Sequence, residues 1–258
     1  MSNQRASTTT AEDIDVLEVN RRFYDGLWSG TRLVQPHRFN TWPLVSKLAE
    51  SSSRRLEVGP GMRPRLPVKD THFADISEPA LNALAGHGGK VEEARICNLP
   101  YADNSFELVC ALDIIEHVED DEAAMAELAR VAEPGATILL STPLHPEYWS
   151  TFDEIVGHHR RYAPETLDSL LRRNGLVVEQ SAIFGMKPKS SRLSTLGLWF
   201  LERDRAMALR VYNRILMPLG LRLQKRLKLI EGMVETDGVD EIFLVCRLAS
   251  SDSCSADG

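Results

Sequence analysis

Short apolar runs alternate with amphipathic stretches along most of this chain. Runs rich in branched and aromatic apolar residues predict seven strands, at residues 55–58, 72–75, 91–96, 106–112, 136–141, 176–183 and 241–248. Apolar residues at helical spacing predict helices between them, at residues 77–85, 120–132 and 164–174. Strands that alternate with helices favour a parallel sheet covered on both faces. The pattern therefore predicts an α/β fold, Rossmann-like and doubly wound, with a mostly parallel seven-stranded sheet.

Residues 11–50 are predicted to form two helices ahead of the first strand. Apolar residues recur at helical spacing up to Trp28, and Pro36 can open a second helix that reaches about Glu50. These helices form either a cap over a ligand site or a further layer on the sheet. Residues 1–10 and 249–258 are polar and are predicted to be disordered tails.

Small and polar residues stand where the predicted strands end. They are Gly59, Asp75, Asn98, Asp113 and Thr142. The carboxyl ends of parallel strands meet at one edge of a sheet, and ligands of such sheets bind beyond that edge. We therefore expect these positions to form one shared site.

The sequence Gly59-Pro60-Gly61 directly follows the first strand. Glycine allows a tight turn with positive φ and lets a ligand approach the backbone closely. A plain surface turn can also contain such glycines. A dinucleotide fingerprint would need a third glycine three residues after Gly61, where this chain has Pro64. The loop thus argues against a dinucleotide cofactor.

The succession of these motifs with Asn98-Leu99-Pro100-Tyr101 and Asp113-Ile114-Ile115-Glu116-His117 resembles the class I S-adenosylmethionine-dependent methyltransferases, in particular their type 11 branch. The resemblance covers roughly residues 54–184, the predicted cofactor-binding core, and the last strand at residues 241–248. It implies S-adenosylmethionine as cofactor. It also assigns cofactor binding to Glu57, Gly59, Pro60, Gly61, Asp75, Ile76, Cys97, Asn98, Leu99, Asp113, Ile114 and His117.

The resemblance also implies roles for individual residues. Asp75 would accept the hydroxyl protons of the ribose; its alternative role is to cap the helix that follows. Glu57 would orient the glycine loop or contact the amino-acid end, and Ile76 would pack against the adenine. His117 could hold a loop, contact the cofactor or act as a base.

One position departs from the family pattern. Relatives usually have an aspartate four residues before Leu99, where it meets the adenine amine, and this chain has Arg95 there. The backbone of Ile96 or Cys97, or the Asn98 side chain, could hold the adenine instead.

Histidines and aromatic residues gather after the fifth predicted strand, between Thr142 and Tyr162. This segment should face the open end of the site, where a methyl acceptor must lie. Methyl transfer needs alignment, and a hydroxyl acceptor also needs a base. We predict His158 and His159 as that base, with His145 as a weaker candidate; alternatively these residues only pin the loop. No ligand spacing indicates a metal site.

Residues 186–238 form a predicted helical insertion with a strong positive charge. Eleven basic and two acidic residues lie between Met186 and Ile230, a local charge of +9 in a chain of −7. Basic and apolar residues interleave there at helical spacing, which is typical of helices on anionic membranes. Segment 190–230 could bind a membrane, form a homodimer face, cover a lipophilic or acidic acceptor, or pack on the domain. The acidic remainder of the chain argues against nucleic acid.

Composition narrows the class of protein and its location. With 43% hydrophobic and 26% charged residues over 258 positions, the chain has the composition of one globular domain. No run of 18 apolar residues predicts a transmembrane helix, and the polar N-terminus predicts no export. Four cysteines without metal-like spacing fit a reducing compartment, so we expect a cytoplasmic protein.

Together these patterns predict methyl transfer from S-adenosylmethionine to a small-molecule or lipid-linked acceptor, with oxygen as the favoured acceptor atom. Two other functions stay open at this level. One is a nucleotide-binding oxidoreductase, which Pro64 argues against. The other is a non-catalytic cofactor-binding or interaction protein, which the departure at Arg95 leaves open.

Overall fold

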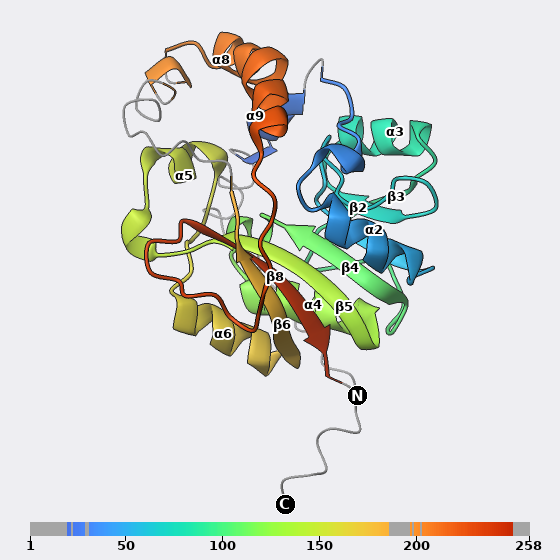
Figure 1. Ribbon diagram of the computed structural model, residues 1–258. Coiled ribbons are helices and arrows are strands. Elements are labelled where there is room, and N and C mark those ends of the chain that lie inside the picture. Colours follow the sequence, from blue (N-terminus) through green and yellow to red (C-terminus); the bar gives the residue numbers. More distant parts are fainter. Residues whose placement is uncertain are drawn as a thin grey trace, which may run out of the picture.

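The computed structural model describes residues 20–21, 23–28, 31–185, 197, 199–201 and 203–249 (Figure 1). The predicted tail at residues 1–10, the start of the predicted cap at residues 11–19 and most of the predicted C-terminal tail lie outside these residues. Residues 186–196 of the insertion also lie outside them. Among the residues described, no helix is both long and apolar enough to cross a membrane.

A single sheet forms the centre of the described chain. Its strands are β1 (Arg55–Val58), β2 (His72–Asp75), β3 (Lys90–Glu93), β4 (Phe106–Leu112), β5 (Ala132–Pro143), β6 (Leu176–Ile183), β7 (Ile230–Glu231) and β8 (Glu241–Leu248). Their order is β3-β2-β1-β4-β5-β8-β6-β7. The first five strands of this order, β3, β2, β1, β4 and β5, run parallel to one another. Strand β8 runs antiparallel to both β5 and β6. The mostly parallel Rossmann-like fold is thus confirmed, with the two-residue strand β7 in addition to the seven predicted strands.

Helices cover both faces of this sheet (Figure 1). The described helices are α2 (Trp42–Glu50), α3 (Glu78–Gly86), α4 (Asp121–Val131), α5 (Thr151–Val156), α6 (Pro164–Arg173), α8 (Arg205–Val211) and α9 (Met217–Leu223), of which α5, α8 and α9 lie beyond one end of the sheet rather than on its faces. On one face, Leu128 of α4 and Leu171 of α6 share a core with Leu56 of β1. On the other face, Val45 of α2 packs with Leu108 and other sheet residues. Burial on both faces explains why the central strands read as continuous apolar runs.

The helix boundaries follow local sequence signals. Asp120 precedes α4, and its carboxylate accepts a hydrogen bond from the Ala123 backbone N–H at 2.9 Å. Pro79 lies in the first turn of α3 and Pro164 opens α6, where a missing N–H costs nothing. The predicted helices at residues 77–85, 120–132 and 164–174 therefore agree with the structure to within a residue at each end.

Two strands differ from the prediction at their ends. The strand predicted at residues 91–96 ends at Glu93, because the chain then turns and the Asn98 N–H donates to the Arg95 carbonyl at 3.0 Å. Strand β5 begins at Ala132 rather than at Ala136, because Ala132 pairs with Phe106 before the register shifts. Irregular pairing of this kind depends on the neighbouring strand, so the order of apolar and polar residues within one strand does not predict it.

Only the first half of the predicted N-terminal cap lies beside the site. Residues 20–21 and 23–28 are helical, and Trp28 shares a small core with Met62, next to the glycine loop. The second predicted helix is interrupted: Pro36–Arg38 form a 3-10 turn, and α2 starts at Trp42. Because Val45 is fully buried against the sheet, α2 is a layer of the fold and the prediction of a cap over residues 11–50 is wrong for this half.

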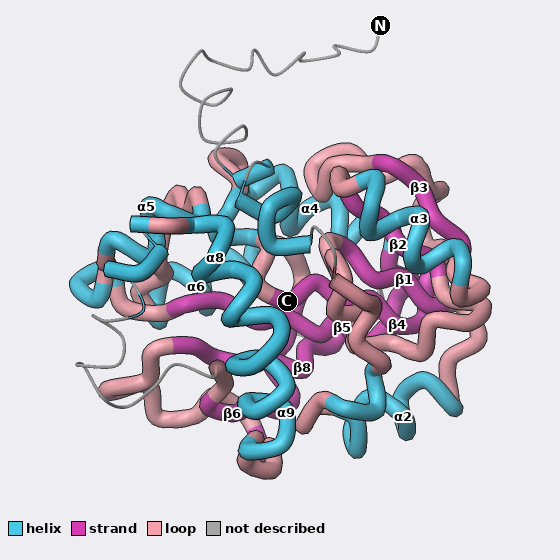
Figure 2. The backbone as a smooth tube through the Cα atoms, turned by 90° about the horizontal axis from the view of Figure 1, so that it is seen from above, coloured by secondary structure: helices cyan, strands magenta, loops and turns pink. Residues whose placement is uncertain are grey.

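The described part of the basic insertion is helical up to Leu223. Helix α8, a π-helical turn at Tyr212–Leu216 and α9 follow one another without a break, as Figure 2 shows. We call this continuous run helix 205–223. After it the chain has no regular structure until β7, so the prediction of a helical insertion over residues 186–238 is wrong for residues 224–229. The Asn213 side-chain amide donates to the Leu27 carbonyl at 2.6 Å and ties the run to the N-terminal helix.

Candidate cofactor site

A cavity of about 1010 Å³ lies at the carboxyl ends of the parallel strands. Its size is suited to a small-molecule ligand. Eleven of the fourteen residues that the sequence predicts for the site line this cavity: Glu57, Gly59, Pro60, Gly61, Asp75, Ile76, Cys97, Asp113, Ile114, His117 and His159. They come from the ends of five strands, β1 to β5, or from the segments that follow them, so the fold brings together residues that lie up to about a hundred positions apart in the sequence. Asn98, Leu99 and His158 do not line the cavity.

The glycine loop is shaped by both conformation and packing. Gly59 has φ of 65° and Gly61 has φ of 52°, a region that other residues rarely adopt. A Cβ atom on Gly59 would lie 2.1 Å from Ile114 Cδ1, and one on Gly61 would lie 2.4 Å from the Trp28 ring. The loop therefore passes between two side chains that leave no room for a methyl group.

Asp75 joins this loop to the end of β2. Its Oδ2 accepts a hydrogen bond from the Gly61 N–H and its Oδ1 accepts one from the Ser77 N–H, both at 2.8 Å. The side chain is 7% exposed, and burial raises the pKa of its carboxyl. Of the two roles that the sequence left open, the Ser77 contact matches the capping role. A carboxylate has about four acceptor positions, so two remain for a ligand diol.

Glu57 holds the chain that follows the glycine loop. Its carboxylate accepts hydrogen bonds from the Arg65 N–H at 2.8 Å and from the Leu66 N–H at 2.9 Å. Burial raises the pKa of Glu57 to about 7, although these backbone donors act in the opposite direction. The side chain also lines the cavity, so its geometry is compatible with the predicted orienting role.

Only some of the residues predicted to contact the adenine line the cavity. Ile76, Arg95, Ile96 and Cys97 line the cavity there. Leu99 does not, because its side chain is buried in the main core and its N–H donates to Glu127 at 2.8 Å. Asn98 is exposed on the outer side of the turn. Backbone or side-chain contacts from Arg95 to Cys97 are therefore the ones available to an adenine.

Asp113 adds a carboxylate at the end of β4. It has φ of 54°, and its Oδ1 accepts a hydrogen bond from Ser141 Oγ at 2.6 Å. Strained residues of this kind often lie at functional sites. With Glu57 and Asp75 it brings three carboxyl groups to a cavity wall that also contains the side chains of Arg21, Arg63, Arg65 and Arg95. A carboxylate at such a wall attracts a cationic group that lies next to it.

His117 lies between the cavity and the N-terminal helix. The Asn20 side-chain amide donates to its Nδ1 at 2.8 Å, and its Nε2 lies 3.3 Å from the Tyr24 hydroxyl. Burial lowers the pKa of His117 to about 3. The imidazole is therefore neutral near pH 7 and is a weak base. Asn20, Tyr24, Trp28 and Arg63 also line the cavity and were not predicted as individual residues. The predicted cap allowed the N-terminal helix to lie over the site, but no local pattern shows which of its side chains face the cavity.

His158 belongs to a buried polar network behind His117. Its ring centroid lies 4.5 Å from that of His117, and its Nδ1 lies 2.9 Å from Asp153 Oδ1. Asp153 is completely buried and also accepts a hydrogen bond from Arg161 Nε at 2.8 Å. Burial alone would raise the pKa of Asp153, but the hydrogen bonds from His158, Ser150 and Arg161 hold it below its usual value. This geometry matches the alternative that His158 pins the loop.

The two other histidines of the segment differ in position. His159 lines the cavity, and its backbone N–H donates to the Glu116 carbonyl at 2.8 Å. His145 lies away from the cavity, with its Nε2 at 2.8 Å from the Thr236 carbonyl. Of the three histidines predicted as bases in the segment after β5, the structure therefore brings only His159 to the cavity wall.

One cluster of ligand-type side chains lies next to the cavity. Potential ligand atoms of Glu116, His117 and His158 lie within 4.8 Å of one another. Both nitrogens of His117 and the Nδ1 of His158 already have protein partners, and Glu116 Oε2 lies 3.4 Å from the Thr142 hydroxyl. The partners are those of a structural network, so we assign no metal to it.

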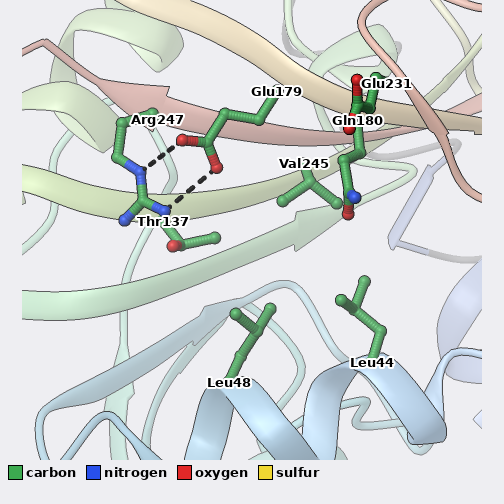
Figure 3. A pocket seen from close by; sticks show the side chains of 8 residues that line it. All are labelled: Leu44, Leu48, Thr137, Glu179, Gln180, Glu231, Val245 and Arg247. Atoms are coloured by element: carbon green, nitrogen blue, oxygen red, sulfur yellow. Dashed lines mark hydrogen bonds and ion pairs between the residues drawn. The ribbon is translucent and has the colours of Figure 1, made fainter.

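A second hollow, of about 470 Å³, lies between α2 and the strands β5, β6 and β8 (Figure 3). Leu44 and Leu48 point toward it from α2, and Arg247 forms an ion pair with Glu179 at 2.9 Å on its other side. It contains none of the residues predicted for the site, so the cavity at the strand ends is the better candidate.

The sheet order, the glycine loop and the acidic residue after β2 are those of the class I S-adenosylmethionine-dependent methyltransferase fold. Residues 57–140 match the family model for the methyltransferase domain of the type 11 branch. Norajmaline N-methyltransferase from Rauvolfia serpentina is 34% identical over 73 residues, which are 28% of this chain and 25% of that protein. The O-methyltransferase resE from Aspergillus sclerotiorum is 27% identical over 154 residues, 52% of this chain and 58% of that protein.

Solved structures share the whole fold at low sequence identity. A methyltransferase from Thermotoga maritima has a TM-score of 0.54 at 18% identity and covers 92% of this chain and 94% of its own. Phosphoethanolamine N-methyltransferase 2 from Haemonchus contortus, in complex with S-adenosylhomocysteine, has a TM-score of 0.55 at 16% identity over 93% of this chain and 61% of its own. The cyclase SpnF has a TM-score of 0.57 at 15% identity, over 92% of this chain and 95% of its own, so the fold alone does not fix the reaction.

The residues at the site fit S-adenosylmethionine. The hydrogen bonds from Gly61 and Ser77 leave acceptor positions on both oxygens of Asp75 for the ribose hydroxyls. The two glycines present bare backbone to the cavity. The Asp113 carboxylate lines the same cavity and can attract the sulfonium or the ammonium group of the cofactor.

Proposed function

We propose that this protein transfers the methyl group of S-adenosylmethionine to a small-molecule or lipid-linked acceptor. The observation that carries the proposal is the convergence of eleven predicted residues on one cavity at the strand ends. The family match of residues 57–140 supports the same class of reaction. The bound cofactor supplies a methyl group activated by its positive sulfur.

The residues of the chain contribute binding and alignment in this proposal. Asp75 would hold the ribose, and Glu57 would keep the glycine loop in place through Arg65 and Leu66. Asp113 would stabilise the positive end of the cofactor. Methyl transfer is an in-line displacement, so alignment of the acceptor contributes most of what the protein can supply.

We favour a hydroxyl acceptor, with His159 as its base. His159 lines the cavity and is anchored by its backbone to Glu116. His158 does not line the cavity, and burial keeps His117 neutral with a pKa of about 3. A base must reach the acceptor and take up its proton, so His159 suits the role better than either neighbour.

A nitrogen acceptor is the second candidate. The carboxylates of Asp75 and Asp113, which line the cavity, would attract a cationic amine, and a neutral amine can attack without a base. Relatives named as N-methyltransferases and as O-methyltransferases both occur.

Calorimetric titration tests the first part of the proposal. We expect the purified protein to bind S-adenosylmethionine and S-adenosylhomocysteine in the micromolar range, and NAD not at all. Transfer of a radiolabelled methyl group to a panel of phenols, alcohols and amines then identifies the acceptor atom. With a hydroxyl acceptor, His159→Ala should reduce kcat by at least about 100-fold, whereas the exposed histidine variant His87→Ala should not. Failure to bind either cofactor form would overturn the proposal.

A further inference from the structure

Helix 205–223 has one face that packs on the domain. Leu209 shares a core with Phe23 and Leu27 of the N-terminal helix, while Met217 and Leu221 pack with Phe39. These buried positions account for one side of the helix only.

A second apolar stripe runs along the outer side of the same helix. It consists of Met207, Val211, Ile215, Leu219 and Leu223, one residue in every four. Except for the half-buried Val211, these side chains are between 42% and 70% exposed. In a regular α-helix a spacing of four residues drifts by about 40° at each step. The wider π-helical turn at Tyr212–Leu216 reduces this drift at the step from Val211 to Ile215, and the exposure of the other four residues shows that they are not part of the buried side of the helix.

Basic side chains lie beside and beyond this stripe. Eight are exposed in the described part of the insertion: Arg203, Arg205, Arg210, Arg214, Arg222, Lys225, Arg226 and Lys228. None of these eight forms an ion pair with a carboxylate among the residues described. Arg210, Arg214 and Arg222 each directly precede a residue of the stripe, which places their charges along its edge.

We propose that this exposed face of helix 205–223 binds the surface of an anionic lipid membrane. The apolar stripe would enter the boundary of the acyl chains, while the arginines and lysines meet the lipid phosphates. The positive charge beside the stripe favours a membrane over a second copy of this protein. A second copy of the same face would bring like charges together, whereas anionic headgroups neutralise them. Docking of this kind does not depend on whether the protein transfers methyl groups.

Helix 205–223 lies next to residues that line the cavity, so a membrane bound to the helix would lie close to the cavity. The Arg63 guanidinium lies over both the Trp28 ring at 4.9 Å and the Tyr212 ring at 5.2 Å. Arg63 and Trp28 line the cavity, and Tyr212 belongs to helix 205–223. A membrane bound to the outer face would therefore lie one helix layer away from the cavity, where an amphiphilic acceptor could reach it.

The test is cosedimentation of the full chain with lipid vesicles. Vesicles of phosphatidylcholine alone are compared with vesicles that contain equal parts of phosphatidylcholine and phosphatidylserine. We expect binding to the second kind only, weakened by added salt because exposed charges are screened. Replacing Arg210, Arg214 and Arg222 by Gln should lower the partition coefficient about 100-fold, because each basic residue near the surface contributes about 1 kcal/mol, or about a factor of five.

Matched variants separate the surface from general effects. Ile215→Ser with Leu223→Ser should also abolish binding, whereas Val177→Ser with Ile183→Ser, two equally exposed apolar positions on β6, should not. Lys69→Gln with Lys90→Gln serves as the control for charge. Circular dichroism and S-adenosylhomocysteine binding confirm that each variant is folded. Three results would each overturn the inference. They are equal binding of both vesicle types, no binding to either type, and a stable dimer that protects Leu223 from labelling.

Discussion

The carboxylate of Asp75 accepts a hydrogen bond from the backbone of Gly61 at 2.8 Å. The acidic residue after β2 and the glycine loop after β1 are thus one unit, although fourteen positions separate them. A change at either position acts on both the shape of the loop and the ligand that the loop would hold.

Replacing Asp75 by Asn should weaken cofactor binding. An amide group cannot accept on both sides, so either the Gly61 or the Ser77 contact is lost together with part of the ribose contact. We expect S-adenosylhomocysteine affinity to fall at least tenfold, equivalent to about 1.4 kcal/mol. Calorimetry measures this, with Asp237→Asn in an exposed turn as the control. Unchanged affinity for Asp75→Asn would remove the ribose assignment.

Gly61→Ala should destabilise the fold. The new Cβ would lie 2.4 Å from the Trp28 ring, in a backbone conformation that alanine disfavours. We expect a loss of about 3 kcal/mol in the free energy of unfolding, from steric overlap and from the positive φ together.

Gly135→Ala is the matched control for this change. Gly135 has φ of 81°, and a Cβ there meets open space. The conformational cost alone is about 1 kcal/mol, so the difference between the two variants in urea unfolding isolates the contact with Trp28. Equal losses in both variants would show that Trp28 does not restrict the loop.

The stability of the protein should depend on pH through His117. Burial lowers the pKa of this side chain to about 3, so the folded protein keeps it neutral. The unfolded chain binds a proton below a pH of about 6.5. The stability that this group contributes is therefore present above that pH and is lost as the pH falls toward 3, at about 1.4 kcal/mol per pH unit.

Urea unfolding at a series of pH values checks this dependence. His117→Gln should show a smaller loss of stability on acidification than the unmodified protein, whereas His87→Gln at an exposed position should follow the unmodified protein. Parallel curves for all three proteins would contradict the buried, neutral state of His117.

Asp153→Asn should loosen the loop that carries His158 and His159. The change leaves the buried Arg161 with a weaker partner, and a broken buried ion pair costs about 3 kcal/mol. Asp168→Asn removes an exposed ion pair with Arg172 and should cost no more than about 0.5 kcal/mol. Thermal unfolding of both variants gives the comparison. A small effect of Asp153→Asn would mean that the network does not fix the loop.

The sequence was sufficient for the sheet and for the strand-end site. Strands such as β1 and β4 are buried on both faces, so they appear as apolar runs, and the residues at their ends are fixed by the direction of the chain. This is why Gly59, Asp75 and Asp113 could be placed at one edge before the structure was known. The cofactor-facing half of the site was therefore predictable from local patterns.

The acceptor side was less predictable because it depends on contacts between distant segments. Tyr24 meets His117 across 93 positions, and nothing near Tyr24 in the sequence indicates that contact. The roles of His158 and His159 differ only because Asp153 holds one of them. Leu99 resembled a ligand residue by its motif, yet it lies in the core because α4 covers it.

The antiparallel strand β8 also constrains how the chain can be completed. It lies between β5 and β6 and forms hydrogen bonds with both. Until residues 241–248 have been synthesised, both neighbours expose unpaired edges, which are prone to join other chains. The protein is therefore most prone to aggregation during its synthesis, because the whole basic insertion must be made before β8 can pair with β5 and β6.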